Sequence, residues 1–257
     1  DLKGGLLQEQ NRATSALMIA GLRRDRVSRC IAGEQGKALA TRMTETMPQL
    51  PAMIKSRTET LEQQLEQHAR HIPQVVVLGV GLDPKPVYHS GGRQTWYGID
   101  LKPALRDREK RFCVPGCVAD NFIPVAGDMR DQQWVEDLKA AGFDPTQPSV
   151  VIMEGLSMYL TSDVISKVFK HIEQLTTQGS ILWVDHITSN ALDMETARDF
   201  FAAMGRLGEP MVFGCTDMGQ FAGNSWQVLQ SVSAADILST GDHLFEAYRF
   251  TTLQRSE

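Results

Sequence analysis

Five short apolar runs, each followed by a polar or helix-like segment, limit the folds open to this chain of 257 residues. The runs QVVVLG, TWYGID, FIPVAG, SVVIMEG and SILWVD begin at residues 74, 95, 122, 149 and 180. Strands of such nearly continuous hydrophobicity are buried on both faces, which requires a parallel sheet covered by helices. Helical patterns lie between the runs, most clearly over residues 131–141 and 162–175. The sequence therefore predicts an open α/β fold.

The first 73 residues have a different texture, because apolar side chains recur there at helical spacing and no strand-like run occurs. Pro73 ends this region, since proline lacks the amide proton that a helix interior requires. We expect a helical N-terminal cap over residues 1–73 and a core over 74–257, with a pocket-forming insertion at about 187–225. The runs WQVLQSVS and LFEAYRFTTL predict two further strands near the C-terminus.

Charge and cysteine content exclude several classes of protein. The chain has 26 Lys and Arg against 31 Asp and Glu, so it lacks the basic excess of a nucleic-acid binder. It has no apolar stretch of the roughly 20 residues that span a bilayer, and its first residues are polar, so we expect a cytoplasmic protein without membrane contact. Cys113 and Cys117 lack further ligands at zinc-site spacing, which favours reduced thiols and no bound metal.

A glycine pair followed by an acid marks the ends of the first two predicted strands. Gly79 and Gly81 lie at a strand-to-turn junction, where the missing Cβ lets the backbone approach a ligand closely. Asp100 lies 100 − 79 = 21 residues after Gly79, where an acid accepts hydrogen bonds from ribose hydroxyls. A dinucleotide fingerprint would have its third glycine at position 84, which is Pro84. This proline argues against a pyrophosphate cradle and against an NAD-dependent oxidoreductase.

The next candidates concern the two ends of a nucleoside ligand. Asp128 and Met129 end the third strand and offer a carboxylate for an exocyclic amine and an apolar cover for an adenine ring. Arg57 falls on the apolar side of its helix, where a guanidinium needs an anion. It either reaches a surface carboxylate or clamps the carboxylate of a ligand. Among common ligands with adenosine and no phosphate, S-adenosylmethionine fits these features first.

The motifs LGVGLDPKPVY, IDLK, GDMRDQQWVEDLKAAGFDPTQPSVVIMEGLSMYL and GEPMVFG resemble the leucine carboxyl methyltransferase family. The resemblance is strongest to its bacterial branch, which includes polyketide-pathway O-methyltransferases. It implies a class I S-adenosylmethionine-dependent methyltransferase on a Rossmann-like, seven-stranded, mostly parallel sheet, with helices on both faces and an antiparallel last strand. The positions that the resemblance implies for cofactor binding are Arg57, Gly79, Gly81, Asp83, Asp100, Leu101, Asp128, Met129 and Glu154.

The methyl acceptor is the part of the reaction that the resemblance constrains least. Thr14 and Ser15 stand where eukaryotic members of the family carry a lysine and an arginine near the substrate entrance. This difference favours a small-molecule acceptor over a protein C-terminus, while a carboxylate and a hydroxyl both stay open. A carboxylate is already ionised at neutral pH, whereas a hydroxyl would gain from a base.

Tyr159 and His186 are the candidate catalytic residues, because they follow the fourth and fifth strands at the ligand edge of the sheet. Either side chain could instead be a packing residue. Phe200, Phe201 and the segment MVFGCTDM could line an apolar acceptor pocket. Carboxyl methylation of a protein C-terminus and a non-catalytic S-adenosylmethionine-binding module remain alternatives, and the sequence leaves the oligomeric state open.

Overall fold

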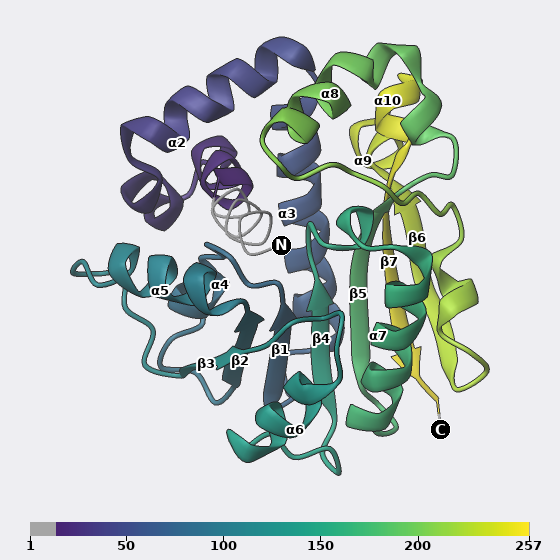
Figure 1. The fold of residues 1–257 in the computed structure, drawn as a ribbon. Coiled ribbons are helices and arrows are strands. Elements are labelled where there is room, and N and C mark those ends of the chain that lie inside the picture. Colours follow the sequence, from purple (N-terminus) through teal and green to yellow (C-terminus); the bar gives the residue numbers. More distant parts are fainter. Residues whose placement is uncertain (1–13, 257) are drawn as a thin grey trace.

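The computed structural model describes residues 14–256, in which seven strands form one central sheet (Figure 1). The strand order is β3-β2-β1-β4-β5-β7-β6. Only β7 runs against its neighbours, pairing antiparallel with both β5 and β6. The predicted open sheet with an antiparallel last strand is thereby confirmed. The strands are β1 Gln74–Leu78, β2 Thr95–Asp100, β3 Phe122–Ala126, β4 Ser149–Met153, β5 Ile181–Ile187, β6 Trp226–Ser233 and β7 Tyr248–Arg255.

Helices cover both faces of the sheet, as Figure 1 shows with α6 and α7 in front and α3 behind. Alternate residues of β1 accordingly belong to two apolar clusters, with Val75 and Val77 in one and Val76 and Leu78 in the other. The helices are α2 Arg26–Thr46, α3 Leu50–His68, α4 Lys85–Tyr88, α5 Lys102–Arg111, α6 Gln133–Ala140, α7 Ser162–Leu175, α8 Arg198–Arg206, α9 Ala234–Leu238 and α10 His243–Glu246. Short 3-10 turns are η1 Ser157–Tyr159, η2 Ala191–Asp193, η3 Glu195–Ala197 and η4 Met218–Phe221.

Local sequence signals set the helix ends. The side chain of Asp25 caps α2 by accepting a hydrogen bond from the Ser28 amide at 2.9 Å. Pro51 lies in the first turn of α3, where its missing amide costs no hydrogen bond. Gly33 has φ +60°, so α2 is two helical pieces joined at a break. The helix predicted over 162–175 has those bounds as α7, and the one predicted over 131–141 is α6.

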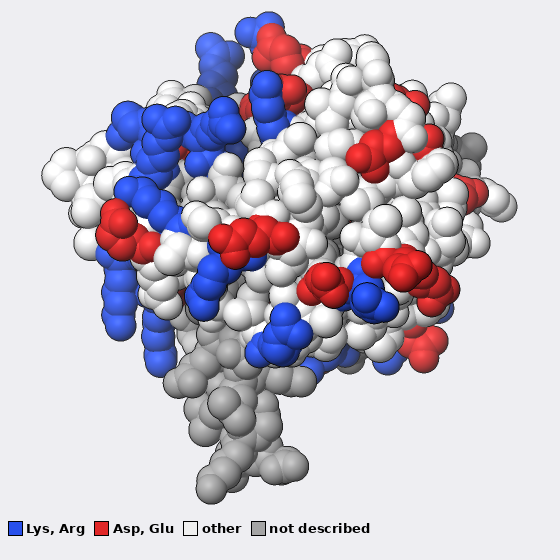
Figure 2. Space-filling view, turned by 90° about the horizontal axis from the view of Figure 1, so that it is seen from above, with Lys and Arg blue, Asp and Glu red and all other residues white. Residues whose placement is uncertain are grey.

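The N-terminal helices gather over one end of the sheet, together with α8 and α10 (Figure 1). Residues 14–22 form a helix that precedes α2, while residues 1–13 of the predicted cap lie outside the described residues. Seen from this end, Lys and Arg side chains crowd the side on which α2 and α5 lie, although the chain carries a formal charge of −5 (Figure 2). Within residues 14–256, no helix is both long and apolar enough to cross a membrane.

Candidate functional site

A cavity of about 490 Å³ lies at the carboxyl ends of β1, β2, β4 and β5. Its volume is within the range of small-molecule sites, and its position is where open α/β sheets bind ligands. The helix over 14–22, the start of α3 and the segment 187–225 complete the walls. The structure brings the following predicted residues to this cavity: Arg57, Gly79, Gly81, Asp83, Asp100, Glu154 and Tyr159.

The turn after β1 is held by the acid at the end of β2. Gly79 and Gly81 have φ values of +66° and +46°, in the left-handed region that favours glycine. The amide of Gly81 donates to Asp100 Oδ2 at 2.8 Å, and the amide of Leu101 donates to Asp100 Oδ1 at 2.8 Å. Asp100 therefore fixes the glycine turn and lies in the cavity wall, whereas Leu101 contributes only its backbone beside the wall.

Glu154, directly after β4, is the centre of a buried charge cluster. Its Oε1 accepts from Lys85 Nζ at 2.8 Å and from Arg23 Nη2 at 3.1 Å, and its Oε2 lies 3.3 Å from Arg57 Nε. Lys85 Nζ also lies 2.7 Å from Asp83 Oδ2. Burial alone raises the pKa of Glu154, but the three cations outweigh burial and hold this pKa well below its ordinary value. Glu154 is therefore ionised at neutral pH.

Arg57 turns inward from α3 and is only 4% exposed. Its Nη1 lies 3.6 Å from Asp185 Oδ2 and 3.4 Å from the Tyr248 hydroxyl, which itself donates to Asp185. Asp185 also accepts from the amide of Gly155 at 2.7 Å. The guanidinium thus meets buried carboxylates and does not reach toward a surface acid. Its buried Nε makes no hydrogen bond with correct geometry to any described residue.

The structure corrects the expectation that His186 reaches the ligand edge. His186 is 1% exposed and does not line the cavity. Its Nδ1 lies 2.6 Å from the carbonyl of Cys215 and its Nε2 lies 2.8 Å from Thr251 Oγ1. Burial lowers the pKa of His186 to about 4, so the ring is neutral. Because side chains alternate along β5, the strand presents Asp185 and not His186 to the cavity side.

The adenine-side role of Asp128 and Met129 stays a prediction, because the structure places neither residue in the cavity wall. Arg130 binds the Asp128 carboxylate through Nε at 2.9 Å and Nη2 at 2.6 Å. Met129 is 7% exposed and packs in the same apolar cluster as Trp134. Neither Asp128 nor Met129 lines the cavity, whereas Arg130 does. The carboxylate of Asp128, just after β3, is thus paired with Arg130, two residues further along the chain.

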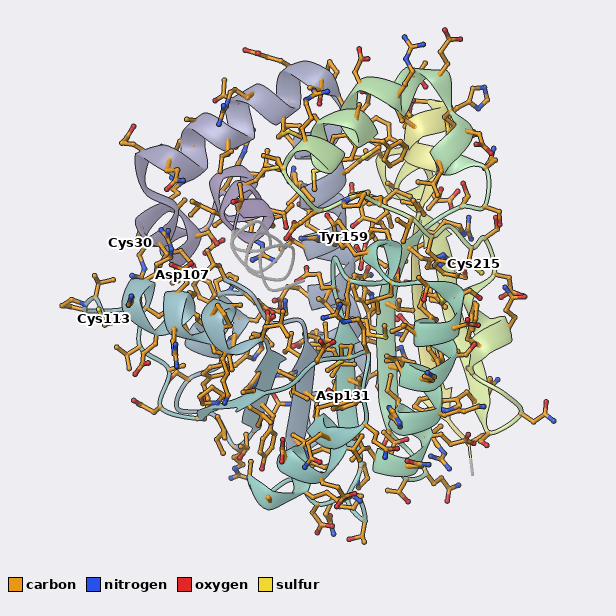
Figure 3. The ribbon with its side chains drawn as sticks, viewed as in Figure 1. Cys30, Asp107, Cys113, Asp131, Tyr159 and Cys215 are labelled. Carbon is orange, nitrogen blue, oxygen red and sulfur yellow. The ribbon has the colours of Figure 1, made fainter. Side chains whose placement is uncertain are left out.

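Tyr159 does line the cavity, from the η1 turn beyond β4 (Figure 3). Burial, and secondarily the negative charge of Glu209, raise the pKa of this phenol. Tyr159 therefore stays protonated near neutral pH and can donate a hydrogen bond, but it is not suited to remove a proton. Phe200, Phe201 and Met211 form apolar wall in the segment 187–225.

Sequence reasoning missed five residues around the cavity. Signals existed for some of them, because Glu209 belongs to the motif GEPMVFG that carries the family resemblance and Asp185 is an acid within an apolar run. Lys85 lies within LGVGLDPKPVY, which also carries the resemblance, whereas Arg23 and Tyr248 gave no comparable signal. The missed residues are Arg23, Lys85, Asp185, Glu209 and Tyr248.

The described wall of the cavity is more acidic than basic. Three cations line it against five acids, so it favours a ligand with net positive charge and disfavours a pyrophosphate. The cations are Arg23, Arg57 and Arg130, and the acids are Asp83, Asp100, Asp107, Glu154 and Glu209.

A glycine turn held by an acid at the end of β2, in an open parallel sheet, defines a Rossmann-like protein with a nucleoside-type site. Solved structures share this fold. A "putative methyltransferase" from Thermobifida fusca aligns with a TM-score of 0.70 at 16% identity, covering 96% of this chain and 94% of that one. The N-methyltransferase NodS from Bradyrhizobium japonicum, in complex with S-adenosyl-L-homocysteine, aligns with a TM-score of 0.54 at 12% identity over 80% and 89% of the two chains.

The chain belongs to the leucine carboxyl methyltransferase family, whose model matches residues 11–173, and the sequence resemblance is thereby confirmed. A "Putative S-adenosyl-L-methionine-dependent methyltransferase" from Mycolicibacterium vanbaalenii is 32% identical over 133 residues, 49% of this chain and 42% of that protein. A relative of the same description from Rhodococcus jostii is 28% identical over 179 residues, 63% and 58% of the two chains. The chain spans about half the length of these curated relatives.

Proposed function

We propose that this protein is an S-adenosylmethionine-dependent O-methyltransferase that acts on a small-molecule acceptor in the cytoplasm. Membership of the leucine carboxyl methyltransferase family supports a methyl transfer, and the names of its curated relatives support the cofactor. The departures at Thr14 and Ser15 support a small acceptor, such as a polyketide or another secondary metabolite.

The paired charges of Arg57 and Glu154 carry this proposal. The amino-acid end of S-adenosylmethionine has one carboxylate and one ammonium group, which are complementary to a guanidinium and a carboxylate held side by side in a cavity wall. Arg57 lines the cavity, so its guanidinium can meet an incoming carboxylate there. Asp100 would accept from the ribose hydroxyls. The cavity residues therefore fit the cofactor at both ends.

Methyl transfer requires little covalent chemistry from the protein itself. When bound, S-adenosylmethionine supplies an electrophilic methyl group on a positively charged sulfur. The chain must hold the acceptor oxygen in line with that methyl and exclude water. The apolar wall formed by Phe200, Phe201 and Met211 serves both purposes. The excess of acids over cations in the cavity wall favours the positive charge of the cofactor.

Charge pairing favours a hydroxyl acceptor over a carboxylate. Each cation of the described wall already faces an acid: Arg23 and Arg57 face Glu154, and Arg130 faces Asp128. A carboxylate acceptor would lose its hydration without gaining an uncompensated cation there, which is costly in an apolar compartment. A hydroxyl can instead accept a hydrogen bond from Tyr159. Glu209, whose charge acts on Tyr159, is the wall carboxylate that we propose to receive the hydroxyl proton.

Calorimetry with S-adenosylhomocysteine and NADH tests the cofactor. Arg57→Ala and Asp100→Ala should each weaken binding of S-adenosylhomocysteine by about 1–3 kcal/mol, the range for lost charge-assisted hydrogen bonds. Arg70→Ala is the matched control, because Arg70 is exposed and, among the described residues, pairs only with Glu66 near the end of α3. Preferential binding of NADH would overturn the proposal. Binding without turnover on any acceptor would favour the non-catalytic module.

Transfer of a labelled methyl group tests the acceptor. Aromatic or enolic compounds that present a hydroxyl should be methylated, whereas matched compounds with a carboxylate in its place should react more slowly. A peptide ending in a leucine carboxylate tests the protein C-terminus directly. Faster methylation of that peptide than of every small molecule would contradict both the acceptor class and the charge argument.

A further inference from the structure

The first helical piece of α2 is hydrogen-bonded to the last residue of α5 and to the loop that follows this helix. Arg26 Nη2 donates to the carbonyl of Gly116 at 2.9 Å, and Arg111 Nη1 donates to the carbonyl of Ile31 at 3.1 Å. Cys30 lies four residues after Arg26 and therefore on the same helix face. Cys117 follows Gly116 directly. These contacts place Cys30 and Cys117 at the same junction between α2 and the loop after α5, although 117 − 30 = 87 positions separate the two residues in the sequence.

The two thiols differ in accessibility and interact with each other. Cys30 is exposed, whereas Cys117 is 1% exposed and belongs to the apolar core. Burial, followed by the neighbouring Cys30, raises the pKa of the Cys117 thiol. Figure 3 places Cys30 on the side of α5 and Cys215 on the opposite side of the molecule. The accessible sulfur of Cys30 thus lies near the buried sulfur of Cys117.

We propose that Cys30 and Cys117 form a redox-active thiol pair that hydrogen peroxide converts to a disulfide. The exposed sulfur of Cys30 attacks one peroxide oxygen, the O–O bond breaks, and Cys30 sulfenic acid and water form. The sulfur of Cys117 then attacks the sulfenic sulfur and expels a second water as the S–S bond forms. Two thiols are oxidised and one peroxide is reduced to two waters, so atoms and electrons balance.

The position of the pair gives the disulfide a mechanical consequence. Residues 26–32 lie between the non-helical residues 23–25 and the break at Gly33, so this piece of helix is bounded by a joint on each side. Arg23, at the first joint, donates to Glu154 in the cavity wall. A bond from Cys30 to the core would therefore restrain the segment that places Arg23 in the site.

Peptide mapping of the full chain tests the pair. Trypsin releases Cys117 on the peptide 112–130, which also contains Cys113, so the linkage is mapped in Cys113→Ser. After peroxide, this variant should lose the mass of two hydrogen atoms and yield the peptide 30–37 joined to 112–130. Dithiothreitol should reverse both changes. Cys30→Ser and Cys117→Ser should give no such product, whereas Cys215→Ser should behave as the wild type. A folded Cys113→Ser protein that forms no linked peptide, or a Cys30–Cys113 bond in the wild type, would overturn the proposal.

Exchange of S-adenosylhomocysteine provides a second readout, which rests on the proposed function. Oxidation should slow its dissociation in the wild type and in Cys113→Ser, but leave the rate in Cys30→Ser unchanged. The two proposals fail separately: a disulfide without ligand binding removes the cofactor assignment alone, and ligand binding without the disulfide removes the thiol pair alone. A disulfide that leaves the dissociation rate unchanged would contradict the restraint of Arg23.

Discussion

Replacing Glu154 by glutamine tests the charge cluster most directly, because it removes one negative charge and keeps the shape of the side chain. Three cations lie within 3.3 Å of its two oxygens, at 2.8, 3.1 and 3.3 Å. The side chain is 5% exposed, so solvent compensates little for the lost charge. Removing one member of a buried ionic group costs about 3–5 kcal/mol, since the partners stay buried without compensation. We expect Glu154→Gln to lower the free energy of unfolding by that amount.

Urea unfolding at pH 7 measures the effect, with Glu66→Gln as the control. Glu66, on α3, lies 2.8 Å from Arg70 just beyond the helix in an exposed pair, where the same change should cost less than about 1 kcal/mol. Acid titration also tests the direction in which the free energy of unfolding changes with pH. The folded-state pKa of Glu154 is lowered, so its contribution is complete above its ordinary pKa of about 4.3 and is lost as the pH falls further. If the two variants lose equal stability, the buried cluster does not depend on the charge of Glu154.

Three further predictions concern the acceptor side and the strand β5. Phe201→Ala or Met211→Ala should weaken acceptor binding more than binding of S-adenosylhomocysteine, and equal losses in calorimetry would contradict a separate acceptor wall. Tyr159→Phe should lower turnover while leaving S-adenosylhomocysteine affinity unchanged; a matching loss of affinity would assign the phenol to the cofactor instead. The pKa of His186 falls from about 6.5 to about 4 on folding, so stability on the order of 3 kcal/mol is complete above pH 6.5 and lost toward pH 4. His186→Gln should flatten this slope in urea midpoints and retain turnover, and a large loss of turnover would restore His186 as a catalytic candidate.

Features carried by a single strand or its end could be predicted from the sequence. The apolar runs located the strands, and the carboxyl ends of parallel strands converge on one edge. Gly79, Asp100 and Glu154 each follow or end such a run, so their meeting in one cavity follows from topology. Arg57 was predicted from a different signal, the helical spacing of the apolar residues around it.

Side-chain direction in β5 could not be predicted in this way. The strand ILWVDHI is buried on both faces, so hydrophobicity does not alternate along it and cannot show which residues face the cavity. Choosing His186 over Asp185 selected the wrong face. The pairing of buried charged residues could not be predicted either, because Arg23 and Glu154 are 131 positions apart and only the folded chain brings them together.

The buried cluster also defines which charge pattern a ligand can bring. Its cations Arg23, Arg57 and Lys85 balance the acids Asp83, Glu154 and Asp185, which is the condition under which buried charges are tolerated. A zwitterionic tail adds one charge of each sign and preserves the balance.

Methylthioadenosine has the same nucleoside and lacks that tail, so comparing it with S-adenosylhomocysteine isolates the contribution of the cluster. The wild type should prefer S-adenosylhomocysteine, and Arg57→Ala should reduce this preference by about 1–3 kcal/mol, because only the ligand with a carboxylate loses a charge-assisted hydrogen bond. Asp100→Ala should weaken both ligands alike, since both contain the ribose. An undiminished preference in Arg57→Ala would mean that the cluster maintains the fold of the cavity wall and does not recognise the amino-acid end of the ligand.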